Sequence, residues 1–199
     1  MAWLFVLLVI VTFDIAGVRP TKLSRDALQQ LRQPFYLGMI SNFGVLAWCS
    51  AAALPLFASF HLTTREAVSF LRWIGTLTLL LMFDDLLMLH EQVLPTYLHL
   101  PEETLYAVYF AYMCLFLSKF WRFILTHTHY KILVLAFALF GVSIAIELNI
   151  LPGGIDVEDW FKIMGIVTYA YYCIATASGL LSKSRNDASD SSPLQHPTQ

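Results

Sequence analysis

The chain has 199 residues, of which 58% are hydrophobic and 13% are charged, and its mean hydropathy is +0.65. Soluble domains carry about 25% charged residues, so this composition excludes a soluble domain and indicates an integral, multi-pass membrane protein in the lipid bilayer. The net charge of −2 and the absence of a basic run argue against nucleic acid as a partner.

Six segments are long and apolar enough to be membrane spans, each of which needs roughly 20 apolar residues. The first, residues 1–18, is short and contains Asp14. It lacks the basic start of a signal peptide, so we interpret it as an uncleaved helix. The others cover residues 35–60, 68–94, 102–125, 132–148 and 157–181. The sequence therefore predicts an all-α, polytopic membrane bundle of about six transmembrane helices.

The remaining segments differ from the spans in composition. Residues 19–33 carry apolar side chains near helical spacing among polar ones, which predicts a short interfacial helix after the first span. Residues 182–199 lack aromatic side chains and are rich in Ser, Asp and Pro, which is typical of a disordered polar tail. We expect one transmembrane domain over residues 1–181, followed by this tail.

Acidic side chains are predicted to gather at one membrane face. Consecutive spans run in opposite directions, so the third and fifth spans end where the fourth and sixth begin. These four ends carry Asp84, Asp85, His90, Glu91, His99, Glu102, Glu103, Glu147, Asp156, Glu158 and Asp159. Loops at the opposite face hold more Lys and Arg, by six to four, which favours that face as the cytoplasmic one.

The stretch FDDLLMLHE, residues 83–91, places ionisable groups in an apolar segment. In a helix that continued through the third span, Asp84 would lie near the bilayer midplane. A carboxylate there costs several kcal/mol unless it is paired, protonated or metal-bound. At 100° per residue, Asp84 and Glu91 share one stripe, and we expect both to face inward. His90 would reach the site obliquely, and Asp85 would be protonated or hydrogen-bonded elsewhere.

The neighbouring spans offer matching polar faces. In the sixth span a polar stripe is formed by Glu158, Lys162, Gly165, Tyr169, Tyr172 and Thr176. Lipid does not tolerate such a stripe, so it should face the bundle interior, and Gly165 would allow close helix approach. Together with Tyr106 and Tyr109 in the fourth span, and Ser143 and Glu147 in the fifth, it predicts a tyrosine-lined cavity open to the acidic face.

Carboxylates and an imidazole from several helices are the ingredients of a metal site. The predicted ligands are Asp84, His90, Glu91 and Glu147. Tyr106, Tyr169 and Lys162 are the predicted catalytic groups, which would orient a substrate or transfer a proton. The first hypothesis is therefore a metal-dependent membrane hydrolase or oxidase that uses iron, zinc or manganese on a lipid-soluble substrate.

Other functions fit the same residues. A buried carboxylate cluster with Lys162 and tyrosines would also form the relay of a proton- or cation-coupled transporter or channel. A non-catalytic subunit or assembly factor of a larger membrane complex, or a homo-oligomer, would pair its acids with a partner. Simpler explanations exist for some residues: acids at helix starts are favoured by the helix dipole, and Glu158 and Lys162 can form a surface pair four residues apart.

Overall fold

The structure is a computed structural model that describes residues 38–148, 150–152 and 154–190, together with residues 11–12, 15, 31–32, 34 and 36. These residues form helices and connecting turns, with no strand among them. The predicted all-α class is therefore confirmed. The interfacial helix expected over residues 19–33, and the first span expected over residues 1–18, lie almost entirely outside the described residues.

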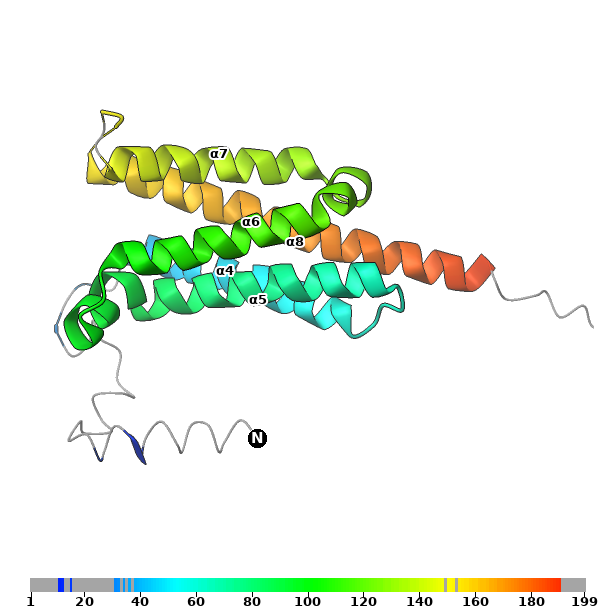
Figure 1. Ribbon diagram of the computed structural model, residues 1–199, viewed down its shortest axis with the longest axis horizontal. Helices are drawn as coiled ribbons and strands as arrows, with labels where there is room; N and C mark the ends of the chain where they lie inside the picture. The colour runs from blue at the N-terminus through cyan, green and yellow to red at the C-terminus, as the bar shows by residue number, and fades with distance from the viewer. Residues whose placement is uncertain are drawn as a thin grey trace, which may run out of the picture. The chain divides into compact units, whose positions relative to one another are not determined.

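The described residues form six helical elements: α4 (Met39–Ser59), α5 (Arg65–Leu87), η1 (Leu89–Leu98), α6 (Glu102–His127), α7 (Tyr130–Glu147) and α8 (Ile155–Asp190). All of them except η1 are labelled in Figure 1. Five of them, α4 to α8, are long and apolar enough to cross a membrane. They correspond one to one with the last five predicted spans. The chain is thus a multi-pass membrane protein with a helical bundle.

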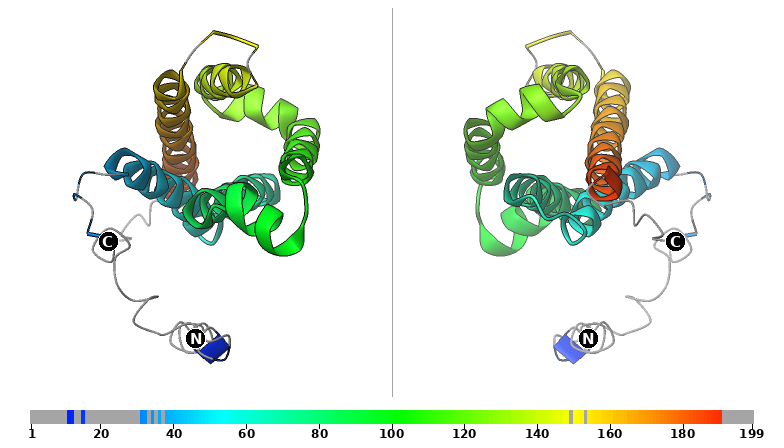
Figure 2. Two further views of the ribbon diagram at one scale, coloured as in Figure 1. Left: turned by 90° about the vertical axis from the view of Figure 1, so that its left-hand side faces the viewer. Right: turned by 90° about the vertical axis from the view of Figure 1, so that its right-hand side faces the viewer.

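By its internal contacts the chain divides into two compact units, Met1–Met39 and Ile40–Gln199, where one domain was expected. The second unit contains nearly all of the described residues. Within it, α5, α6, α7 and α8 alternate in direction (Figure 1), and the view along the helices shows them arranged around a common axis with α7 beside α8 (Figure 2).

The last helix is longer than expected. α8 continues to Asp190, past residue 181 where the predicted span ends and into the predicted tail. Extending an existing helix is far easier than starting one, because each added residue gains a hydrogen bond without a nucleation cost. The polar composition of residues 182–190 is therefore compatible with a helix that leaves the membrane.

The third predicted span, residues 68–94, is not one straight helix. α5 ends at Leu87, Met88 takes a left-handed conformation (φ 50°, ψ 45°), and η1 follows with π-helical hydrogen bonding. Left-handed backbone is uncommon outside glycine and terminates an α-helix. Pro95, inside η1, lacks the N–H that would bond to the Glu91 oxygen in an α-helix, which disfavours a return to α-helix after the break but does not account for its position at Met88. Asp84 lies in the last turn of α5, about 5 Å from the end of that helix, and not within one continuous helix as the predicted depth assumed.

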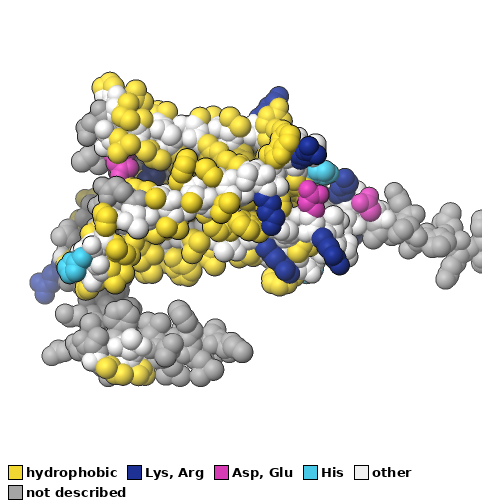
Figure 3. Space-filling view, in the orientation of Figure 1, with side chains coloured by type: hydrophobic (Ala, Val, Ile, Leu, Met, Phe, Trp, Pro, Cys, Tyr) yellow, Lys and Arg dark blue, Asp and Glu magenta, His cyan; other side chains and the backbone are white. Residues whose placement is uncertain are grey.

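Aromatic side chains form much of the core. The Phe70 ring on α5 is fully buried against three rings of α6, with centroid distances of 5.5 Å to Phe116, 5.6 Å to Phe120 and 4.8 Å to Phe123. Such pairs add about 0.5–1.5 kcal/mol each beyond the burial of their area. Large apolar side chains also cover the outside of the bundle (Figure 3), as expected for helices that face lipid.

Two glycines allow helices to approach closely. A Cβ atom at Gly75 of α5 would lie 2.6 Å from Leu56 Cγ on α4, and one at Gly165 of α8 would lie 2.8 Å from the Phe140 ring on α7. Gly165 therefore has the packing role that its place in the polar stripe predicted. Small residues at such contacts are the usual device of helix packing in membranes.

Gly75→Ala is expected to lower the free energy of unfolding by about 1–3 kcal/mol, as overpacking does. Gly141→Ala on α7 is the control, because a Cβ there has no neighbour within 4 Å. Thermal unfolding in a mild detergent would measure both. Equal stability of the two variants would contradict the proposed close contact between α4 and α5.

Candidate functional site

Five described acids of the spanning helices, Asp84, Asp85, Glu147, Glu158 and Asp159, lie where α5 and α7 end and where α8 begins, on the left of Figure 1, whereas Glu66 and Asp187 lie at the other end. This confirms the convergence predicted from the alternation of the spans. Lys and Arg side chains gather mainly at the other end (Figure 3). At the acidic end, polar contacts connect α5, α6, α7 and α8 to one another.

The contact between α5 and α8 is an ion pair. Lys162 Nζ lies 3.4 Å from Asp85 Oδ1, and the two side chains are 39% and 18% exposed. Asp85 sits in the last turn of α5, where the helix dipole disfavours a carboxylate and no basic residue is present on the same turn. The pair therefore offsets a charge that its own helix does not stabilise. Asp85, which was expected outside the site, is part of it.

The contact between α5 and α6 involves the most buried acid. Asp84 is only 5% exposed, and its carboxylate interacts with the hydroxyl of Tyr109 on α6 through a side-chain hydrogen bond. A phenol is a suitable donor to a carboxylate because it supplies a hydrogen bond without adding a charge. The inward position expected for Asp84 is thus found, although the helix geometry used to predict it was wrong.

The remaining two contacts involve α7. The Tyr106 hydroxyl on α6 donates to Glu147 Oε1 over 3.5 Å, at the long limit of a hydrogen bond. Ser143 Oγ donates to the backbone oxygen of Glu158 on α8 over 3.2 Å. With the two contacts of α5, they close a cycle through four helices. We call this set the acid–lysine ring: Asp84, Asp85, Tyr106, Tyr109, Ser143, Glu147, Glu158 and Lys162.

Of the four predicted metal ligands, the structure describes the side chains of Asp84 and Glu147 only, so the set of four stays a prediction. No group of three His, Cys, Asp or Glu in the described part of the chain could hold a metal ion. His90 and Glu91 lie on η1 beyond the break at Met88, so Asp84 and Glu91 do not share a helical stripe. The side chains of His90 and Glu91 lie outside the described residues.

Tyr169, one of the predicted catalytic residues, lies deep in the bundle. Its side chain is 2% exposed, and its hydroxyl is 2.9 Å from Thr78 Oγ1 on α5. Because Thr78 donates its own hydrogen to the backbone oxygen of Ile74 over 2.7 Å, Tyr169 must donate to Thr78. Tyr169 is therefore separate from the acid–lysine ring, seven residues along α8 from Lys162.

A second hydroxyl pair lies further along α8. The Tyr172 hydroxyl donates to Thr128 Oγ1 over 3.1 Å, and Thr128 donates to the backbone oxygen of Ile124 over 2.7 Å. Thr176 Oγ1 is buried nearby in sequence without a hydrogen-bond partner among the described residues. These side chains, with those of the first pair, form what we call the hydroxyl line: Thr78, Tyr169, Tyr172, Thr128 and Thr176.

Two members of the hydroxyl line were not predicted. Thr78 lies in the run TLTLLL of the third span, residues 76–81, where Thr76 is a second threonine, so the sequence alone did not distinguish Thr78. Thr128 lies between predicted spans and carries no signal of its own, because many loops contain threonine. The inward orientation of the α8 stripe is confirmed for Gly165, Tyr169 and Tyr172, which are all buried.

The fold and site define a class: a multi-pass helical membrane protein with ionisable groups at one end of its bundle. Residues 1–176 match the family model described as Domain of unknown function (DUF8692), and the chain belongs to this family. No match was found among curated proteins or among solved structures.

The Asp85–Lys162 pair should show a measurable coupling energy. In a double-mutant cycle of Asp85→Asn, Lys162→Met and the double variant, we expect about 0.5–2 kcal/mol, between the values of exposed and buried pairs. Thermal unfolding in detergent gives the four stabilities. Additive effects of the two single substitutions would contradict an energetic link between α5 and α8 at this point.

Proposed function

We propose that this protein is a proton-coupled transporter or channel in which the polar face of α8 forms the proton path. One observation carries the proposal: polar side chains follow the inner face of α8 from the acid–lysine ring to the hydroxyl line. From Lys162 to Thr176 this face extends about 21 Å, most of the roughly 30 Å of a hydrocarbon core. Polar groups at such depth in a spanning helix favour a role in ion or proton movement.

The chemistry of these side chains suits a proton relay. A hydroxyl can both donate and accept a hydrogen bond, so Tyr169 can pass a proton to Thr78 if the Thr78 hydroxyl turns away from the backbone oxygen of Ile74, to which it now donates. At the acidic end, Asp84 and Asp85 provide acceptors. Protonation of Asp85 would remove its charge and release Lys162, which couples proton uptake to the contact between α5 and α8.

Aromatic side chains lie between the acid–lysine ring and the hydroxyl line. The Phe140 ring packs on Gly165, which lies between Lys162 and Tyr169 on α8. Trp48 of α4 stacks on Phe140 at 6.0 Å and contacts Tyr169 at 5.5 Å between ring centroids. We call Phe140 and Trp48 the aromatic gate. Hydrophobic constrictions close conduction paths by excluding water, which supports a closed state here.

Tyr169→Phe should reduce proton flux by about tenfold or more, a change of about 1.4 kcal/mol in the barrier. The substitution removes one hydroxyl and keeps the ring that packs against Trp48. Tyr171→Phe is the matched control, since Tyr171 is two residues away on α8 and 61% exposed on the outer surface. Liposomes that enclose a pH-sensitive dye, followed after an external acid pulse, would measure the flux.

Phe140→Ala gives the opposite arm of the same experiment. Opening the aromatic gate should raise the proton leak through the variant. If the purified variant is monodisperse in detergent, loss of folding would not explain the higher leak. Wild-type flux in Tyr169→Phe together with unchanged leak in Phe140→Ala would overturn the proton path along α8.

The metal-dependent enzyme is the second candidate. The observation that favours it is the hydrogen bond between Tyr106, a predicted catalytic residue, and Glu147, a predicted ligand. A metal ion beside Glu147 would activate water or oxygen for a lipid-soluble substrate, and Tyr106 would transfer a proton.

Elemental analysis of protein purified in mild detergent tests this second candidate. It predicts about one or two equivalents of iron, zinc or manganese per chain, lost in Glu147→Gln and Asp84→Asn. Glu66→Gln is the control, because Glu66 lies at the start of α5, away from the acid–lysine ring. Protein that is purified without metal and takes up none on reconstitution would contradict the metal-dependent enzyme. The same result would not contradict the proposed proton path.

A further inference from the structure

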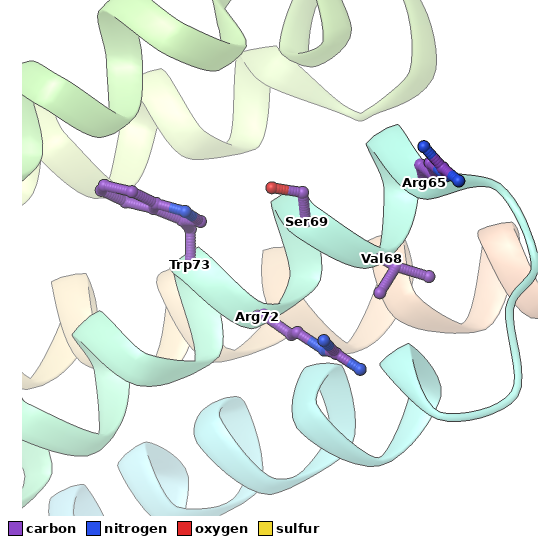
Figure 4. Close-up of a pocket in the computed structure, with 5 residues that line it drawn as sticks. All are labelled: Arg65, Val68, Ser69, Arg72 and Trp73. Carbon is purple, nitrogen blue, oxygen red and sulfur yellow. The ribbon is translucent and has the colours of Figure 1, made fainter.

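A hollow of about 330 Å³ lies at the other end of the bundle, over the first turns of α5 (Figure 4). It is lined by Arg65, Val68, Ser69, Arg72 and Trp73. Arg65 stands at the start of the helix, and Ser69 and Trp73 point to one side of it while Arg72 points to the other. We infer that this hollow binds the phosphate of an anionic phospholipid headgroup.

The charge of the hollow supports an anionic ligand. Neither guanidinium forms an ion pair with a carboxylate among the described residues, although Glu66 follows Arg65 in sequence. Arg72 lies 5.8 Å from the centroid of the Phe60 ring, a contact that leaves its N–H groups able to donate. Arg65, Ser69 and Arg72 all line the hollow, Ser69 and Arg72 from opposite sides of the helix, and their N–H and O–H groups are donors that the oxygens of a phosphate between them can accept.

A third cation lies beside the same hollow. Lys119 Nζ of α6 lies 4.7 Å from the centroid of the Trp73 ring and 5.1 Å from that of Phe120. The cation–π contacts with the two rings stabilise the position of Lys119. An ammonium group has three N–H donors, so donors remain that can bind a ligand in the hollow. The hollow is thus bordered by cations from both α5 and α6.

The depth of the hollow favours a lipid over a free phosphate. Arg72 is about 10 Å from Arg65 along the helix axis, which places the pair across the boundary between headgroups and acyl chains. Trp73 is the type of residue that concentrates at this boundary. Phe57 and Phe60 at the end of α4 are 58% and 76% exposed, and they provide an apolar surface for acyl chains next to Arg72.

The face itself is consistent with such lipids. The excess of Lys and Arg in its loops favours the cytoplasmic side, where anionic lipids give the membrane surface its negative potential. Basic pockets between spanning helices on that side are the form that headgroup sites take. This inference is independent of the proton path, which begins at the opposite end of the bundle.

Native mass spectrometry of the detergent-purified chain, titrated with phosphatidylglycerol, tests the site. Arg65→Gln and Arg72→Gln should each weaken retention by about tenfold or more, the loss expected for a charge-assisted contact to phosphate. Arg122→Gln should bind like the wild type. Arg122 is also an arginine near this end, stacked on Trp121 at 5.2 Å, but it does not line the hollow.

The other outcomes distinguish the source of the phosphate. Glycerol 3-phosphate or inorganic phosphate is added as a competitor of phosphatidylglycerol, at concentrations that leave phosphatidylcholine binding unchanged. Displacement of phosphatidylglycerol under these conditions would overturn the lipid assignment in favour of a soluble phosphate. Equal retention of phosphatidylglycerol by all three arginine variants would overturn the site. Thermal unfolding of each variant, measured in parallel, separates lost binding from lost folding.

Discussion

The structure depends on satisfying polar groups inside a bundle whose outer surface is apolar. Lys162 and Asp85 illustrate this constraint, because each is a charge within a spanning helix and each lies within 3.4 Å of the other. The two side chains are 39% and 18% exposed, so the pair lies between an exposed and a buried ion pair, and it contributes to the contact between α5 and α8 at this point. The acid–lysine ring extends the constraint to α6 and α7 through tyrosine and serine hydroxyls, which satisfy carboxylates without adding charge.

How far the sequence predicts this structure depends on which physical rule a residue obeys. The number of helices follows from the length of the apolar segments, and five such helices are found. The meeting of Asp84, Asp85 and Glu147 near one end follows from the alternating direction of consecutive spans. The break at Met88 depends on a single backbone conformation, for which methionine carries no preference. Pro95 was the available warning, but a proline seven residues downstream does not specify where a helix ends.

The sequence predicted which residues of the candidate site face the bundle interior, but not which residues contact one another. The polar stripe of α8 has a helical period, so the inward positions of Gly165, Tyr169 and Tyr172 could be derived. Which residue faces each of them depends on the rotation and crossing of the other helices, which periodicity does not fix. Asp85 was assigned away from the site because, on a straight helix, it points in a different direction from Asp84. In the structure, Lys162 on α8 nevertheless forms an ion pair with it.

Gly165 connects the packing of the bundle to the proposed proton path. Because this residue has no side chain, the Phe140 ring of α7 rests directly on the α8 backbone between Lys162 and Tyr169. The ring meets backbone and no side chain of α8 at that point, so Phe140 could move off Gly165 without displacing an α8 side chain, but it would have to leave the Trp48 ring on which it stacks. The same glycine that brings the two helices together would thus also permit the aromatic gate to open, which is the movement a proton path along α8 requires.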